Sequence, residues 1–221
     1  MKKTLLRSLR CMALVMMGAW MASPALAQTS SVDDTPTGVT EVTQTGPTTV
    51  AMRLADGGLR VLDFYGPGTV RVFQDPAGGA VRDPEATPPA RILADNPRRP
   101  VESLTVKGGA ADGWTVATEA LTLSIGATDG ALSATTADGH TVLTGLTPRF
   151  GGRGVTVTAR AAADECFYGG GMQNGRFSHA GKVIQIVNTS NWTDGGVASP
   201  CPFYWSSAGY GILFHTFSPG R

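Results

Sequence analysis

The sequence predicts an all-β fold, and three observations favour it. Turn signals rich in glycine, aspartate and proline recur roughly every 8–12 residues, the spacing of short strands in a β-sandwich. Apolar and polar residues alternate between these turns, and no stretch outside the N-terminal segment keeps a helical period for three turns. The 29 glycines and 14 prolines fit a chain with many turns. The length is sufficient for one domain with a substantial core.

Residues 1–27 have the pattern of a secretory signal peptide. A basic start is followed by the apolar run Cys11–Met21 and by the small-residue cleavage pattern Ala25-Leu26-Ala27. The apolar run is too short to cross a membrane, which takes about 20 residues. We therefore expect an exported protein that is periplasmic or secreted.

Residues 28–47 are rich in Thr, Ser and Asp without periodicity, and they predict a mobile leader. We expect the domain to occupy residues 48–221, because Val50, Met52 and Leu54 begin a period-two pattern that ends at the hairpin signal Asp56-Gly57-Gly58. Further strands are predicted at Leu59–Phe64 (with a phase slip near Asp63), Val70–Phe73, Ser103–Val106, Trp114–Thr118, Ala120–Ile125, Leu132–Thr136, Thr141–Leu143 and Val155–Val157. The proline-rich residues 75–100 predict an irregular loop.

Charge and metal-ligand patterns exclude several classes of partner. Without the signal peptide, 14 Lys and Arg stand against 17 Asp and Glu, and Arg98-Arg99 is the only basic pair. This balance predicts neither nucleic acid nor a membrane surface as a partner. The three histidines, at positions 140, 179 and 215, are scattered, so we expect no metal and no cofactor.

The last 58 residues contain ten of the sixteen aromatic residues, interleaved with Gly, Asn, Asp and Ser. Aromatic faces with a few amide and carboxylate partners suit a sugar ring, which has apolar faces and a polar rim. Aromatic residues also fill the cores of β-sandwiches, and from composition alone this second interpretation is the more common one.

Four motifs in this stretch occur in an order that resembles glycoside hydrolase family 31. They are Phe167–Phe177 (FYGGGMQNGRF), Asn191–Asp194 (NWTD), Pro202–Trp205 (PFYW) and Gly209–Leu213 (GYGIL). Residues 48–163 match the family only in general pattern. The resemblance implies a galactose-mutarotase-like supersandwich, incomplete at its C-terminus, that precedes a (β/α)8 barrel. A barrel needs about 250 residues, and none follows in this sequence.

The resemblance also implies a function. Family 31 enzymes are retaining α-glycosidases, so the chain is expected to be the N-terminal portion of an exported enzyme that acts on an α-linked oligosaccharide or glycoside. Their catalytic carboxylates lie in the barrel, which would also be the partner of this domain. We assign no catalytic residue to this chain and expect it to be inactive alone.

The segment Asn191–Gly196 is the strongest candidate for contact with substrate. Gly195 and Gly196 break a strand, while Asn191 and Asp194 favour turns, so we expect an exposed loop at the edge of the sandwich. The resemblance places Asp194 where the family hydrogen-bonds sugar over the barrel mouth, and Trp192 would stack on a sugar face. The alternative is a structural Asx-type turn, in which Asp194 caps its own backbone ahead of Gly195 and Gly196. Tyr204, Trp205 and Tyr210 are expected in a core or an interface rather than at a ligand.

Two alternative functions stay open at this point. The aromatic C-terminal stretch permits a free-standing carbohydrate-binding module, and the implied fold is shared by sugar mutarotases. A mutarotase needs a general acid and a general base facing one sugar, and neither Glu165 nor the histidines supply such a pair. The genomic sequence beyond codon 221 would distinguish an enzyme from a module.

Two further expectations concern the same stretch. Gly169-Gly170-Gly171 is expected to adopt positive φ and to allow close approach of another segment, since no phosphate-loop pattern follows it. Cys166 and Cys201 both depart from the family pattern, and in an exported chain we expect them to form a disulfide, with two free thiols as the alternative.

Overall fold

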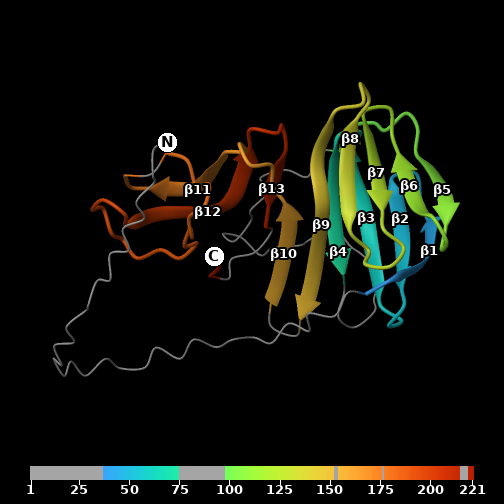
Figure 1. Cartoon of the computed structure of the whole chain (residues 1–221), viewed down its shortest axis with the longest axis horizontal. Coiled ribbons are helices and arrows are strands. Elements are labelled where there is room, and N and C mark those ends of the chain that lie inside the picture. The colour runs from blue at the N-terminus through green and yellow to red at the C-terminus, as the bar shows by residue number, and fades with distance from the viewer. Residues whose placement is uncertain (1–36, 75–97, 152–153, 176, 215–218) are drawn as a thin grey trace, which may run out of the picture.

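The computed structural model describes residues 37–74, 98–151, 154–175, 177–214 and 219–221. These residues form strands and no helix, so the predicted all-β class is confirmed. The strands make three antiparallel sheets of four, six and three strands (Figure 1). In the described part of the chain, no helix could cross a membrane. The predicted signal peptide and residues 75–97 lie outside the described residues.

The four-stranded sheet has the order β1-β2-β3-β4. Its strands are β1 (Val39–Gln44), β2 (Thr49–Leu54), β3 (Leu59–Gly66) and β4 (Thr69–Gln74). The six-stranded sheet has the order β10-β9-β8-β7-β6-β5. Its strands are β5 (Thr105–Gly109), β6 (Gly113–Ala117), β7 (Leu121–Ile125), β8 (Leu132–Thr136), β9 (Thr141–Gly151) and β10 (Gly154–Arg160). The third sheet joins β11 (Phe167–Gln173), β12 (Val197–Ser206) and β13 (Gly211–Leu213) in that order.

The hydrophobic core lies between the four-stranded and six-stranded sheets. Val50, Met52 and Phe64 from the first sheet and Val116 and Leu132 from the second are almost completely buried there. The period-two pattern of β2 and β8 therefore marks the core face, as the sequence predicts. The residues of the core cluster and those packed against it lie on strands β1 to β9 and their connections, so β10 and the third sheet lie outside it (Figure 1).

Strand β3 differs from its predicted pattern because both of its faces are covered. Leu62, Phe64 and the buried Arg60 face the core, where the Arg60 guanidinium donates to the carbonyl of Pro148, 3.1 Å away. On the outer face Asp63 is clamped by Arg98 through two hydrogen bonds of 2.8 and 3.0 Å. A central strand covered on both sides loses the simple alternation of buried and exposed residues. The pairing of β3 with β4 also shifts register between Phe64 and Gly66, beside the phase slip predicted near Asp63.

Strand β1 corrects the predicted leader, which extended to residue 47. Val39 and Val42 are buried although they are three residues apart. The pairing with β2 shifts register between Val39 and Glu41, which is a bulge. A bulge adds one residue to one strand and breaks the period of two, so the alternation that marks a strand is absent from residues 39–44.

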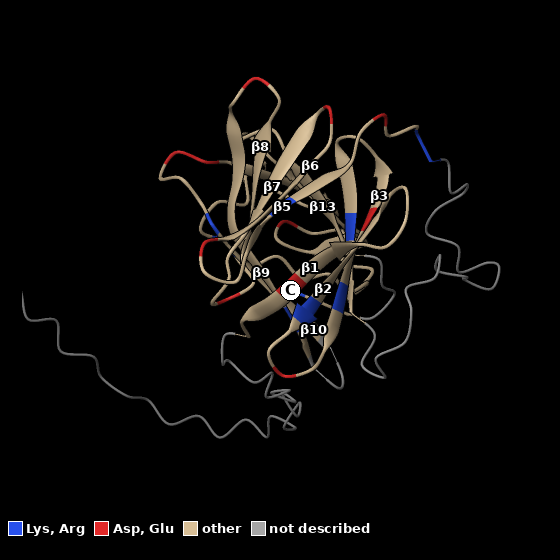
Figure 2. Cartoon of the chain, turned by 90° about the vertical axis from the view of Figure 1, so that its right-hand side faces the viewer, with Lys and Arg blue, Asp and Glu red and all other residues tan. Residues whose placement is uncertain are grey.

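The third sheet extends from one side of the sandwich, beyond β10 (Figure 1). Residues 161–166 connect β10 to β11, and the turn between β12 and β13 approaches β9: a Cβ on Gly209 would lie 3.7 Å from Val142. Acidic residues lie mostly in the turns at the strand ends, while several basic residues lie on strands such as β3 (Figure 2).

Candidate functional site

Residues 191–196 form a loop that enters β12, and it contains an Asx-type turn whose acceptor is Asn191 rather than the predicted Asp194. The Asn191 side-chain oxygen accepts hydrogen bonds from the Thr193 amide at 3.0 Å and from the Thr193 hydroxyl at 2.7 Å. An additional contact closes the loop, because the Gly196 amide donates to the Thr193 carbonyl at 2.9 Å. The loop thus has a defined shape that its own side chains maintain.

The end of β11 anchors this loop through three hydrogen bonds of Asn174. Its amide donates to the Gly196 carbonyl at 3.1 Å, its carbonyl accepts from the Gly195 amide at 2.9 Å, and its side chain donates to the Asn191 carbonyl at 3.0 Å. Asp194 packs beside Gly175, where an added Cβ would lie 3.3 Å from the carboxylate. Both ends of the loop are therefore hydrogen-bonded to Asn174 at the end of β11.

The predicted exposure of this loop is confirmed. Asn191 and Asp194 are exposed, and the Trp192 side chain keeps 68% of its accessible surface. None of the ion pairs found among the described residues involves Asp194. The arrangement offers a carboxylate that can accept hydrogen bonds and an indole face that can stack, both toward solvent. Contact of these side chains with substrate remains a prediction.

Ser190, immediately before the loop, has a backbone conformation that non-glycine residues rarely adopt. Its φ is 50°, in the left-handed region. The Asn188 side chain accepts a hydrogen bond from the Ser190 amide at 2.9 Å and so stabilises the bend. Such strain is tolerated where the surrounding contacts over-determine a turn, and here it sets the direction in which the chain enters the candidate loop.

The triple glycine of β11 has the predicted role. Gly169, Gly170 and Gly171 all have positive φ, and a Cβ on Gly169 would lie 2.6 Å from the Phe203 carbonyl oxygen. The neighbouring strand β12 therefore passes too close for any side chain on the facing side.

Two polar residues beside the glycine segment 169–171 are buried rather than solvated. The Gln173 side chain donates to the Gly170 carbonyl at 2.8 Å, and the His179 ring Nε2 donates to the Gly169 carbonyl at 2.8 Å. In the sequence alone, the polar residues Gln173, Asn174, Arg176, His179 and Lys182 predict either a solvated hairpin or a surface that contacts the barrel or a sugar at its mouth; Arg176 lies outside the described residues. The Gln173 and His179 side chains instead hold the glycine segment and are unavailable to a ligand through the hydrogen-bonding atoms they use there.

Glu165 is the centre of a buried polar network that sequence reasoning missed. One carboxylate oxygen accepts from the Ser206 hydroxyl, and the other accepts from the Ala162 amide at 3.0 Å. Tyr210 also hydrogen-bonds to Glu165. The network ties the connection after β10 to the turn between β12 and β13. A single acidic residue beside a cysteine carries no sequence signal for it, because the side chains that bind it come from the region of Ser206, which is 41 residues away along the chain.

We expect the Glu165 network to make stability pH-dependent. Burial acts to raise the pKa of Glu165, but the hydrogen bonds from Ser206, Ala162 and Tyr210 outweigh it and lower the pKa. A lowered pKa stabilises the folded state above the unfolded value of about 4.3, and that contribution is lost as the pH falls through the folded value. Glu165→Gln should therefore flatten the acid part of the stability profile.

Urea unfolding of residues 28–221 between pH 7 and pH 3 measures this effect. At pH 7 the substitution should cost about 1–3 kcal/mol, because a buried donor loses its acceptor. Glu102→Gln, at an exposed glutamate whose side chain is not in this network, should keep the wild-type pH profile. An identical acid dependence in wild type and Glu165→Gln would contradict the assignment.

The predicted disulfide between Cys166 and Cys201 is wrong, since both are free cysteines. Tyr204 pairs with Gly169 and Pro200 pairs with Gly171, so Cys201 lies opposite the middle of β11. Cys166 instead exchanges hydrogen bonds with Ser207 at the other end of the strand pair. Six residues of strand separate the two positions by about 15–20 Å, whereas a bridge needs Cα atoms within about 7 Å.

The His, Cys, Asp and Glu side chains of the described residues are dispersed. Within them, no group of three or more His, Cys, Asp and Glu side chains is placed to hold a metal ion.

The geometry defines the class of protein as an antiparallel β-sandwich domain with an appended, aromatic-rich sheet and an exposed polar loop. Comparison with protein families places it further: residues 61–221 match the glycosyl hydrolase 31 N-terminal galactose mutarotase-like domain. The chain therefore belongs to glycoside hydrolase family 31, through that N-terminal domain. A search of curated protein sequences finds no match.

Three solved structures illustrate the similarity of fold. The Flavobacterium johnsoniae family 31 dextranase, complexed with isomaltotriose, aligns with a TM-score of 0.69 at 17% identity, over 85% of this chain and 23% of that one. The Listeria monocytogenes cycloalternan-forming enzyme, in complex with a pentasaccharide substrate, gives 0.64 at 19% identity, over 81% and 17%. The Xanthomonas citri family 31 α-xylosidase gives 0.52 at 21% identity, over 83% and 19%. The chain thus spans a quarter or less of these proteins.

Proposed function

We propose that this chain is the N-terminal, site-supporting domain of an exported retaining α-glycosidase. Family membership supports the class of enzyme, and the spacing of the signal-like residues 1–27 supports export to the periplasm or the medium. The single observation that carries the role of the domain is the loop 191–196, which is anchored at a strand end and presents Asp194 and Trp192 to solvent. An α-linked oligosaccharide or glycoside is the proposed ligand.

In this proposal the reaction itself takes place on the (β/α)8 barrel that family 31 enzymes carry. Retaining glycosidases use two carboxylates about 5–5.5 Å apart, one as nucleophile and one as acid/base. Asp194 does not belong to that pair. Its carboxylate accepts hydrogen bonds from sugar hydroxyls near the cleavage point, while the Trp192 ring covers an apolar sugar face. The Asn174 and Asn191 contacts fix the loop backbone that carries both side chains, which limits the entropy lost on binding.

Asp194→Ala is expected to lower kcat/KM by about 1–3 kcal/mol, roughly 5- to 150-fold, because the substrate loses a hydrogen bond to a charged group. The measurement uses a polypeptide in which this chain is followed by the catalytic part of a family 31 enzyme, assayed on p-nitrophenyl α-glycosides. Folding stability should change little, because the carboxylate is exposed.

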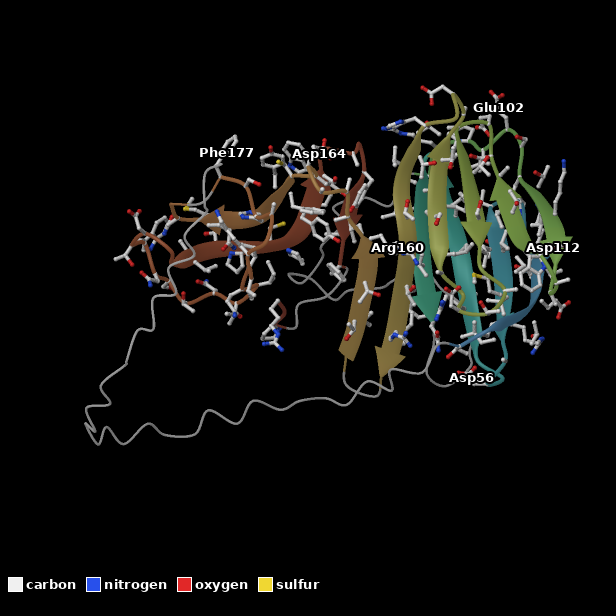
Figure 3. All side chains as sticks on the ribbon, in the orientation of Figure 1. Asp56, Glu102, Asp112, Arg160, Asp164 and Phe177 are labelled. Atoms are coloured by element: carbon white, nitrogen blue, oxygen red, sulfur yellow. The ribbon has the colours of Figure 1, made fainter. Side chains whose placement is uncertain are left out.

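Asp112→Ala is the matched control. Asp112 is also an exposed aspartate in a turn, at the far end of the sandwich between β5 and β6 (Figure 3). It should leave kcat/KM unchanged. If Asp194→Ala and Asp112→Ala behave alike, the loop is structural only. If the chain alone binds isomaltotriose with an affinity that depends on Trp192, the free-standing binding module is the better description.

A further inference from the structure

The third sheet has one face that combines apolar side chains from all three of its strands. Pairing places Tyr168 opposite Trp205, Met172 opposite Ser199, and Phe203 opposite Leu213. We call the side chains Tyr168, Met172, Phe203, Trp205 and Leu213 the aromatic face.

The aromatic face is uncovered within the described part of the chain. Phe203, Trp205, Met172 and Leu213 each retain between 39% and 47% of their accessible surface. Among the described residues, seven of the eight exposed large hydrophobic side chains lie between residues 172 and 213. Soluble domains rarely expose contiguous apolar surface of this kind without a partner.

The rings of this face are held in place before any partner arrives. Tyr168 stacks on Trp205 with centroids 4.5 Å apart and an interplanar angle of 27°. Phe177 meets the edge of Tyr168 at 5.5 Å, at the outer margin of the sheet (Figure 3). The ring of Phe203 lies against the backbone of Gly211, where a Cβ would approach to 3.0 Å. Pre-ordered side chains lose little conformational entropy on association.

The chemistry of the face favours a protein partner over a sugar. The face consists of three aromatic residues, one Met and one Leu, with no charged side chain among them. Depletion of charge together with aromatic and Met enrichment is typical of the core of a protein interface. A carbohydrate site needs convergent polar groups beside its aromatic rings. On this face β12 adds only Ser199 and Cys201 beside Phe203 and Trp205. The Tyr168 hydroxyl is already hydrogen-bonded to Cys166.

We infer that the aromatic face is the docking surface for the polypeptide that follows this domain in glycosyl hydrolase 31 chains. The inference rests on the proposed function and names the surface through which the domain meets the catalytic part. Two findings support that occupant. The matched family domain is by description N-terminal, and the similar solved chains are four to six times as long as the aligned part. The end of β11 that carries Met172 also holds the anchored loop, because Asn174, two residues further on, hydrogen-bonds to that loop.

Cys201 supplies a reporter for coverage of this face. It lies on the same face of β12 as Phe203 and Trp205, because residues two and four positions apart in a strand point to one side, and it is exposed. In a Cys166→Ser background it is the single thiol of residues 28–221. Its rate of reaction with a disulfide reagent should fall at least tenfold when the chain is followed by the catalytic part of a family 31 enzyme. The rate in residues 28–221 alone should not change with millimolar isomaltotriose or with protein concentration.

Substitutions identify the side chains through which the longer polypeptide protects Cys201. Phe203→Ser and Trp205→Ser should restore Cys201 reactivity in the longer polypeptide, whereas Val155→Ser, at an exposed apolar residue of β10 away from this face, should not. Protection by isomaltotriose, or protection that rises with concentration of residues 28–221 and accompanies a dimer in size-exclusion chromatography, would overturn the inference in favour of a sugar or a second copy.

The two proposals fail in different ways. A longer polypeptide that hydrolyses α-glycosides while Cys201 keeps its full reactivity would refute the docking surface and leave the proposed function intact. Protection of Cys201 without any effect of Asp194→Ala on kcat/KM would support the docking surface and refute the proposed sugar contact.

Discussion

Phe64→Ala should lower the free energy of unfolding of residues 28–221 by about 3–5 kcal/mol, the range for removing a buried phenylalanine ring. Phe64 has no accessible surface and is the largest of the completely buried side chains. It lies on the core face of β3, between the two sheets of the sandwich. Truncation removes its contacts and leaves a cavity that rigid antiparallel strands cannot close. Urea unfolding followed by far-UV circular dichroism measures the change.

Phe177→Ala is the matched control for that experiment. The Phe177 ring is 84% exposed and contacts only the edge of Tyr168 among the ring pairs described. Its truncation should cost no more than about 0.5–1 kcal/mol, the range for a surface substitution with one edge-to-face ring contact. A cost below about 1 kcal/mol for Phe64→Ala, by contrast, would mean that the core is able to collapse around the missing ring.

Gly171→Ala is the second substitution with a large expected effect. Gly171 has a φ of 80°, and an added Cβ would overlap the Ser199 carbonyl oxygen and lie 2.5 Å from the Cys201 amide nitrogen. Both neighbours are backbone atoms of β12, so the strand pair must separate. Positive φ costs about 1–2 kcal/mol, and forced overpacking adds about 1–3 kcal/mol, which together predict a loss of roughly 2–5 kcal/mol in the stability of the third sheet.

Gly181→Ala separates the two contributions. Gly181 has a similar φ of 67°, but nothing lies within 4 Å of its Cβ position. It should therefore show the conformational cost alone, about 1–2 kcal/mol. The fluorescence of Trp205, which stacks on Tyr168 across β11 and β12, reports on the third sheet during unfolding. Equal costs for the two substitutions would show that close approach of the strands is not what requires glycine at position 171.

The chain has the N-terminal domain of a glycoside hydrolase family 31 protein and spans 23% or less of the solved relatives described above. Its core is complete between β1 and β9, whereas its third sheet has only Val197 and Ala198 as buried apolar residues. We therefore expect the sandwich to withstand substitutions in the third sheet, and the third sheet to depend on contacts outside it.

Local chemistry accounts for what could be predicted from the sequence. The class of fold, most of the strands from β2 to β10 and the hairpin at Asp56-Gly57-Gly58 follow from period-two alternation and turn residues, which act over a few positions. The exposed loop at 191–196 and the positive φ of Gly169–Gly171 follow in the same way. The four ordered motifs of the last 58 residues indicated the family, and the match over residues 61–221 confirms it.

Long-range pairing decided the rest. The bulge in β1 hides that strand from a search for alternation, and coverage of both faces of β3 places Arg60 in the core. The register of β11 and β12 keeps Cys166 far from Cys201. The turn between β12 and β13 lies against the connection after β10, which brings Ser206 and Tyr210 to Glu165. Each of these features depends on which residue lies opposite which in space. Partners that are distant along the chain leave no local pattern, so only the tertiary structure could determine them.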